Sequence, residues 1–481
     1  MTMIGEMDAE SVAGYFRDKS ILITGSTGFL GKVLVEKILM VQPDVKKLFL
    51  LTRAPNVESA KLRIHTEVTG SEIFQLLKKQ RGVGSALGLD IASLIDLSKD
   101  IDIIVNGAAT TNFSERYDVA FDVNVLGVKH VCAFAKKCPK LKMLLHVSTA
   151  YVAGEQEGLI PEKPFLMGET LRMGTHLDIE SEQNLIKETM RELNANCSTK
   201  KAERRAMKDL GLKRARNFGW SNTYVFTKAL GEMMIGHLRA DIPVVIIRPS
   251  IITSTLKEPF PGWTEGIKTI DTIIVGYAKQ TLPFFLADLD LIMDVIPGDM
   301  VVNAMMVSMS AHSEDQQAHI IYHVTSSLRN PAPYAVLSDS GHRYFFDNPP
   351  CTGRNGEFVQ LKKMRFFSTV ERLIMYMTIK YKLPLEMLHL ANILLWGVFS
   401  RHYNEARRKY RFVMQLIELY APYALFKGCF DDMNSQKLRM AMNKHQNINV
   451  AYCFDFDPKS LDWDDYFYSV HIPGVLKIMD D

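Results

Sequence analysis

Short apolar runs alternate with helical patterns through the first 250 residues of the chain. Val33, Leu34, Ile38 and Val41 recur at helical spacing just after the first run. Runs this apolar are typical of strands buried on both faces of a parallel sheet. The pattern therefore predicts a Rossmann-like, doubly wound parallel α/β sheet, with strands at residues 20–24, 47–52, 101–105, 141–147 and 243–247.

The hydrophobic pattern changes twice after the fourth run. Residues 176–217 form a polar insertion, acidic at first and basic from Lys200 onward. We interpret the basic part as a solvated helical face, the usual meaning of a charge run, with a surface for CoA phosphates or for an anionic membrane as the alternative. After about residue 350, amphipathic patterns at 372–381 and 410–419 predict helices. We expect an α/β domain at 1–340 and a mainly helical domain at 350–481.

Length and composition set limits on this picture. A chain of 481 residues that is 47% hydrophobic is too long for one compact core, which agrees with two domains. Its 57 basic and 54 acidic residues leave a net charge of +3, so we expect no nucleic-acid partner. The six cysteines are scattered without CxxC pairs. This spacing argues against a metal site and against disulfides, and it favours a reducing compartment.

No targeting or membrane-spanning segment is expected from the sequence. The first 20 residues include acidic side chains and lack the apolar centre of a signal peptide. Residues 383–400 form the most apolar later stretch, but they include Glu386, His389 and Asn392. Their uninterrupted part, 390–399, has half the length that spans a bilayer. We expect this stretch to be a buried or interfacial helix.

A glycine-rich turn follows the first predicted strand and opens the first predicted helix. Gly25 permits the tight turn, Gly28 lets a pyrophosphate approach the backbone, and Gly31 allows close helix packing. The start of the helix adds unpaired N–H groups for the phosphates. The turn predicts a nicotinamide dinucleotide site that includes Gly25, Ser26, Thr27, Gly28, Phe29, Leu30 and Gly31.

Further cofactor contacts are expected where later strands end. Arg53 follows the second strand, at the position where NAD enzymes place a carboxylate for the ribose diol, and a guanidinium there suits the 2′-phosphate of NADPH. After the third strand, Asn106 and Ala108 leave room for the cofactor. Pro249 and Ser250 close the fifth strand beside the nicotinamide.

Candidate catalytic residues come from two separate segments. Tyr224 and Lys228 are four apart, on one helix face, and a nearby ammonium favours phenolate and lowers the pKa of the tyrosine. The lysine can also bind the nicotinamide ribose. Ser148 and Thr149 end the fourth strand, at the sheet edge where ligands of such folds bind. We expect Thr149 to polarise a substrate carbonyl, with Ser148 in support.

These motifs resemble the extended short-chain dehydrogenase/reductase family. Within it, the chain resembles the plant-type, alcohol-forming fatty acyl-CoA reductases. Two C-terminal stretches, FDDMN at 430–434 and HIPG at 471–474, are similar to the helical C-terminal domain of those reductases, which sugar epimerases lack. The family motifs in the first part are TGSTGFLG at 24–31, NGAA at 106–109, STAY at 148–151, YVFTK at 224–228 and RPS at 248–250.

The resemblance implies that a long-chain fatty acyl-CoA is reduced to a primary fatty alcohol, through an aldehyde and with two NADPH, in lipid and wax metabolism. It implies that Thr149 and Tyr224 hold the tetrahedral intermediate, that Tyr224 supplies a proton, and that the C-terminal helices shape an acyl tunnel. The expected location is the cytosolic face of the endoplasmic reticulum, in peripheral contact with the membrane, with the cytoplasm as the alternative. The oligomeric state is left open.

One departure from the family pattern lies between Gln80 and Ile101. The family has a further strand there that lines the adenine pocket, and this chain lacks it. Either another segment substitutes for that strand or cofactor affinity is compromised. The alternatives to the fatty acyl-CoA reductase are therefore a catalytically impaired NADP-binding relative and an extended short-chain dehydrogenase that acts on nucleotide sugars.

Overall fold

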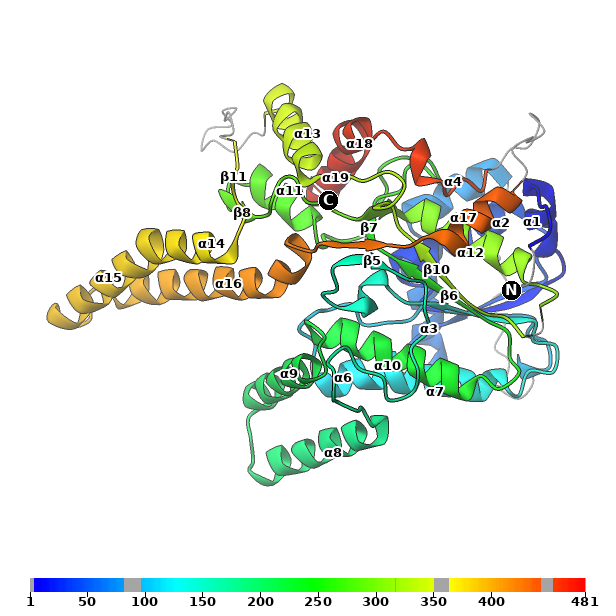
Figure 1. Cartoon of the computed structure of the whole chain (residues 1–481), viewed down its shortest axis with the longest axis horizontal. Helices are drawn as coiled ribbons and strands as arrows, with labels where there is room; N and C mark the ends of the chain where they lie inside the picture. Colours follow the sequence, from blue (N-terminus) through cyan, green and yellow to red (C-terminus); the bar gives the residue numbers. More distant parts are fainter. Residues whose placement is uncertain (1–3, 82–96, 316, 350–362, 443–452, 481) are drawn as a thin grey trace.

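A six-stranded parallel sheet forms the centre of the molecule, in the order β10-β6-β4-β3-β1-β2 (Figure 1). The computed structural model describes residues 4–81, 97–315, 317–349, 363–442 and 453–480. The five strands predicted from the sequence all form, within two residues of the predicted bounds, and β10 is added at the edge. The Rossmann-like α/β class is thereby confirmed. The strands are β1 (Ser20–Thr24), β2 (Lys47–Leu51), β3 (Ile103–Asn106), β4 (Met143–Val147), β6 (Val244–Pro249) and β10 (His319–Val324).

Helices cover both faces of this sheet (Figure 1). Alternate residues of β1 enter opposite cores, with Ile21 and Ile23 on one face and Leu22 on the other, as the period of two in a strand requires. One face is covered by α1 (Ala9–Tyr15), α2 (Phe29–Val41) and α12 (Gly298–Ala311). The other face is covered by α6 (Tyr117–Phe121), α7 (Gly127–Ala135) and α10 (Thr223–Leu238).

The polar insertion at 176–217 forms two helices, α8 (Ile179–Ala195) and α9 (Lys200–Asn217). Its anchor is the buried carboxylate of Glu182, which accepts a hydrogen bond from the Tyr117 hydroxyl at 2.8 Å and pairs with Arg214. Several other basic side chains of α9 are exposed, as the solvated-face interpretation predicts: Lys200, Lys201, Arg204, Arg205, Lys213 and Arg216.

Several C-terminal segments pack into the body, while residues of 370–425 form a smaller apolar cluster with β8. β12 (Gly428–Phe430) pairs with β5 (Gly158–Ile160), and Trp463 and Tyr466 join the main apolar core. The limits 1–340 and 350–481 therefore describe the sequence pattern, while contacts in space cross between them. The remaining elements of these regions are β7 (Ile251–Thr253), β8 (Phe284–Leu286), β9 (Val295–Pro297), β11 (Arg365–Phe367), α11 (Asp271–Ala278), α13 (Tyr334–Asp347), α17 (Met433–Ala441), α18 (Trp463–Asp465) and α19 (Ile472–Asp480).

A long helical hairpin extends away from the body (Figure 1, left). It consists of α14 (Val370–Met377), a π-helical segment (Thr378–Lys382), α15 (Leu383–Leu394) and α16 (Ser400–Ala424). The helices predicted at 372–381 and 410–419 lie within it. The stretch at 383–400 is not buried as one expectation had it, because Leu390 and Leu394 are exposed to solvent. Among the described residues, no helix has both the length and the apolarity to cross a membrane.

The edge of the sheet at β2 concerns the further strand that the family pattern has between Gln80 and Ile101. Among the described strands, β2 pairs only with β1, and Leu51 is exposed. Residues 82–96, where the sequence departs from the family, lie outside the described residues. Whether another segment substitutes for that strand thus stays an open prediction.

Candidate active site

The glycine-rich turn has the tight geometry that its sequence predicts. Gly25 has φ of +76°, a left-handed conformation that favours glycine, and a Cβ there would lie 2.7 Å from the Ala108 nitrogen. A Cβ on Gly31 would lie 2.2 Å from the Gly25 carbonyl oxygen. Gly28 begins α2, and its N–H donates to the same carbonyl at 3.0 Å. Side chains at Gly25 and Gly31 would therefore break the loop.

This turn suits the pyrophosphate of a dinucleotide. No side chain caps α2 at Gly28, so the N–H groups of the first helical turn are left for a ligand. The Ser26 hydroxyl is buried without a hydrogen-bond partner in the described part of the chain. Phe29 contributes through its backbone, because its ring stacks on Trp263 at 5.2 Å. Thr27 and Leu30 are partly exposed beside the loop.

A chain of buried polar groups joins this loop to the candidate catalytic lysine. The Thr24 hydroxyl donates to Asn106 at 2.8 Å, and the Asn106 amide lies 3.0 Å from Nδ1 of His146. His146 Nε2 lies 3.4 Å from Nζ of Lys228, which donates to the carbonyl of Val147 at 2.6 Å. Burial and the Lys228 charge hold the pKa of His146 well below its usual range. Burial lowers the pKa of Lys228 to about 8.

Tyr224 lies one helical turn before Lys228 on α10, and its ring stacks on Phe113 with centroids 5.8 Å apart. Burial raises the pKa of Tyr224, and Tyr423 adds to the rise. The expectation that Lys228 lowers this pKa is therefore wrong for the structure, because the ammonium is directed toward Val147. The phenol stays protonated at neutral pH and can donate a proton, as a carbonyl reduction requires.

The two hydroxyls at the end of β4 face different surroundings. Thr149 caps the short 3-10 turn that follows, and its hydroxyl lies 3.4 Å from both the Pro249 carbonyl oxygen and the Tyr151 nitrogen, both weak contacts. Ser148 donates to the buried carboxylate of Glu232. Thr149 thus has the freer hydroxyl for a substrate. The contact of Ser148 with Glu232 holds the strand end, and the support of a substrate carbonyl that we expected from Ser148 stays a prediction.

The other predicted cofactor residues border the same region. Ala108 donates its N–H to the Thr24 hydroxyl at 3.1 Å, and Ser250 continues from β6 with its N–H on the Val324 carbonyl. Arg53 is exposed just after β2. The side-chain amide of Asn124 accepts from the N–H of Thr110 and donates to its carbonyl.

Sequence reasoning missed a buried ion pair beneath the site. The Arg248 guanidinium contacts both carboxylate oxygens of Glu232, with Nε at 3.0 and 3.2 Å, and both side chains are buried. The sequence does contain a signal for this pair. Glu232 lies in the apolar run ALGEMM and Arg248 in the apolar run VVIIRP, and a charge buried in such a run needs a partner because an unpaired buried charge is costly.

Sequence reasoning also missed aromatic residues that α16 brings to Tyr224. Tyr420 and Tyr423 both contact Phe113, with ring centroids at 6.0 and 5.0 Å. The Tyr423 hydroxyl accepts a hydrogen bond from Asn222, which caps α10. The C-terminal part of the chain therefore forms one wall of the candidate active site.

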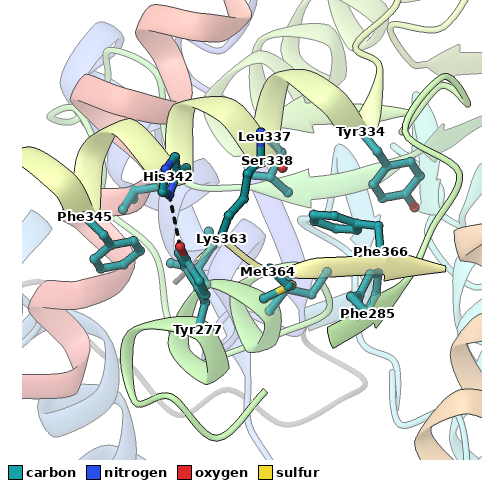
Figure 2. A pocket seen from close by; sticks show the side chains of 14 residues that line it. Tyr277, Phe285, Tyr334, Leu337, Ser338, His342, Phe345, Lys363, Met364 and Phe366 are labelled. Atoms are coloured by element: carbon teal, nitrogen blue, oxygen red, sulfur yellow. Dashed lines mark hydrogen bonds between the residues drawn. The ribbon is translucent and has the colours of Figure 1, made fainter. Parts of the chain in front are cut away.

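A separate apolar pocket lies between α11, α13, β8 and β11 (Figure 2). Phe285, Tyr334, Phe345 and Phe366 line it, and the Tyr277 hydroxyl lies 3.3 Å from Nδ1 of His342. Its volume of about 40 Å³ holds a few water molecules but no fatty acyl chain. None of the predicted site residues lines this pocket.

Comparison with known proteins decides the family. Residues 23–305 match a family model described as male sterility protein, and residues 380–479 match a second model with the same description. The chain is 48% identical to fatty acyl-CoA reductase 1 of Arabidopsis thaliana, over 96% of this chain and 97% of that protein. The chain belongs to the fatty acyl-CoA reductase family. This reductase is also 45% identical to the alcohol-forming fatty acyl-CoA reductase of Simmondsia chinensis, over 97% of this chain and 98% of that protein.

Solved structures support the fold of the reductase. The terminal R domain from the myxalamid PKS-NRPS pathway matches with a TM-score of 0.51 at 17% identity, over 96% of this chain and 94% of that one. An archaeal thiolation-reductase di-domain matches with a TM-score of 0.52 at 14% identity, over 98% of this chain and 79% of that one. At these identities the likeness concerns the fold alone.

Proposed function

We propose that this reductase converts a long-chain fatty acyl-CoA to the primary fatty alcohol, through the aldehyde, with NADPH as the reductant. A nicotinamide cofactor follows from the NAD-binding family model and the fit of the glycine turn. The observation that carries the proposal is the placement of Tyr224 and Lys228 on one helix, with Lys228 bonded to the strand end that carries Thr149. The relationship of the chain to fatty acyl-CoA reductases supports the substrate class.

The side chains of the site divide the chemistry between them. Each NADPH, when bound, supplies one hydride, and two NADPH are used per acyl-CoA. The hydroxyls of Thr149 and Tyr224 donate hydrogen bonds to the carbonyl oxygen and stabilise the negative charge that develops there. In the first stage the C–S bond breaks and CoA leaves as the thiolate, which takes a proton from water, and the aldehyde remains. In the second stage Tyr224 transfers its proton to the alkoxide oxygen, while the Lys228 ammonium holds the strand end through the Val147 carbonyl and is placed to bind the nicotinamide ribose.

The test is incubation of the purified protein with NADPH and a panel of acyl-CoAs, with alcohol, aldehyde and free CoA measured by mass. Alcohol and CoA in equal amounts, with two NADPH oxidised, are expected. Tight NADPH binding without any turnover would instead favour the impaired relative. Turnover of a UDP-sugar without added NADPH would favour the nucleotide-sugar alternative.

Activity should depend on the protonation of Lys228. The pKa of about 8 means that the ammonium predominates below pH 8 and is lost above it. Since the ammonium holds the end of β4 through the Val147 carbonyl and is placed to bind the nicotinamide ribose, kcat/KM should fall about tenfold per pH unit above pH 8. A Lys228→Arg variant, whatever its maximum, should lack this decline, because a guanidinium does not deprotonate in this range. A profile unchanged up to pH 10 in the original protein would remove Lys228 from this role.

The preference for NADPH is assigned to Arg53. An Arg53→Ala variant should lose roughly tenfold in kcat/KM with NADPH and little with NADH, because a charge-assisted bond to phosphate contributes about 1.5 kcal/mol. Arg205→Ala, an exposed arginine on α9, serves as the matched control. Equal losses with both cofactors would show that Arg53 does not read the 2′-phosphate.

We further place the reaction at the cytosolic face of the endoplasmic reticulum, in peripheral contact with the membrane, with the cytoplasm as the alternative. Long-chain acyl-CoA partitions into lipid surfaces, and fatty alcohol does so more strongly, so a reductase at the membrane meets its substrate there. Recovery of the protein in the microsomal fraction, and its release from that fraction by high salt or carbonate, would support this location. Recovery in the soluble fraction under gentle lysis would favour the cytoplasm.

A further inference from the structure

The helical hairpin of Val370–Ala424, called the arm below, exposes apolar side chains to an unusual degree. In Figure 1 the arm extends well beyond the body, with its tip between α15 and α16. Eleven of the 25 large apolar side chains that are exposed among the described residues lie between Ile374 and Val398. A contiguous exposed apolar surface of this kind marks a site of interaction.

Six of these side chains form one stripe along the outer face of α14, the π-helical segment and α15. The opposite face packs on α16, through buried Leu385, the stacked rings of His389 and Tyr403 at 4.6 Å, and the bond from Asn392 to Ser400. The inner faces of the arm therefore pack on each other, and the stripe on the outer face stays exposed to solvent. The stripe consists of Met375, Ile379, Leu383, Met387, Leu390 and Leu394, at spacings of three or four residues.

The tip of the arm presents a tryptophan to solvent. Trp396 is 98% exposed and has φ of +55°, a conformation that residues other than glycine rarely adopt, and Gly397 follows with φ of +89°. No ring contact holds the indole in place within the described chain. Tryptophan is the residue most characteristic of the boundary between water and lipid.

Positive charge is concentrated on the same arm. Residues 370–424 contain eight lysines and arginines and four glutamates, a net charge of +4, whereas the whole chain carries +3. The excess of the chain as a whole is thus located here. On α16, Arg401, Arg407, Arg408, Lys409 and Arg411 are exposed. An apolar stripe beside basic side chains is complementary to an anionic lipid surface.

A polar cleft of about 310 Å³ opens beside the contact between α15 and α16. Its lining brings together the cations Lys382, Arg407 and Arg411, with Glu386 as the one carboxylate of this lining. Nδ1 of His389, which also lines the cleft, is buried without a hydrogen-bond partner in the described residues. Such a set of donors suits a phosphate oxygen.

We propose that the arm docks the reductase on an anionic lipid bilayer, with the stripe and Trp396 at the level of the acyl chains and the cleft against a lipid phosphate. The inference deepens the membrane contact proposed above and names the surface responsible. Because the end of α16 near the body carries Tyr420 and Tyr423 to Phe113, beside Tyr224, docking through the arm ties the active site to the lipid surface through one continuous helix.

Intrinsic fluorescence offers a direct test, because Trp220, Trp263 and Trp463 are buried and Trp396 is the exposed fourth tryptophan. Vesicles of phosphatidylcholine and phosphatidylserine should shift the emission of the full-length protein to the blue and carry the protein upward in flotation. Trp396→Phe should abolish the shift. Met387→Glu should lower vesicle affinity at least tenfold, while Met173→Glu, at a still more exposed methionine off the arm, should not.

The cleft is tested with Arg407→Gln/Arg411→Gln, which should reduce the preference for vesicles with phosphatidylserine over pure phosphatidylcholine. Arg204→Gln/Arg205→Gln on α9 is the control. Undiminished vesicle binding by Met387→Glu would overturn the proposal. The proposal would also be overturned if the original protein bound no vesicles and formed a dimer that Met387→Glu dissociates, since the stripe would then join two copies. Reduction of monomeric acyl-CoA is measured separately, without vesicles. If neither the original protein nor any variant reduces it, the proposed activity is refuted, while the docking proposal stands.

Discussion

A Tyr224→Phe variant is expected to lose about 10²–10⁴-fold in kcat/KM for the reduction of aldehyde to alcohol, because the phenol is the proton donor at that stage. Burial holds its pKa high, so the hydroxyl is protonated throughout the neutral range. The substitution keeps the ring that stacks on Phe113. A loss of activity without loss of folding is therefore expected.

The thioester stage should suffer less from the same change. There the leaving CoA carries away the electron pair of the C–S bond, and Tyr224 donates only a hydrogen bond that Thr149 shares. The variant should accordingly accumulate aldehyde when it is supplied with acyl-CoA and NADPH, which mass spectrometry of timed samples detects. Tyr420→Phe is the matched control, since Tyr420 also contacts Phe113. Aldehyde turnover at the original rate in Tyr224→Phe would contradict the assignment.

The sheet was predictable from the sequence because its strands are buried on both faces and are bounded by turns. Runs such as 20–24 leave few alternatives, and β1 has those bounds in the structure. The path of the C-terminal segments was not predictable, because it depends on contacts between distant residues. The pairing of β12 with β5 joins residues about 270 positions apart, and no local pattern indicates it.

The candidate site shows the same division between local and distant information. The glycine turn and the Tyr224–Lys228 spacing are local patterns, and their geometry could be predicted. The partners of Lys228 could not, since His146 and Val147 come from β4. For the same reason the sequence suggested a lowered pKa for Tyr224: spacing alone cannot show that the ammonium is directed toward a backbone carbonyl.

A Glu232→Gln variant should lose about 3–5 kcal/mol of unfolding free energy, because it leaves the buried Arg248 guanidinium without a counter-charge. Urea unfolding followed by circular dichroism measures this loss. The control is Glu418→Gln, which breaks the exposed pair with Arg216 and should change stability by about 0–1 kcal/mol. The double variant Glu232→Leu/Arg248→Met should recover much of the stability, since it removes both charges together.

The same variant also links stability to catalysis, because Glu232 contacts the strand end and acts on the lysine through its charge. Its carboxylate accepts from the Ser148 hydroxyl and opposes the fall in the pKa of Lys228. In Glu232→Gln the decline of kcat/KM at alkaline pH should therefore begin below pH 8, even under conditions where the protein is fully folded. A destabilised variant whose decline stays at pH 8 would show that the ion pair supports the fold without tuning the lysine.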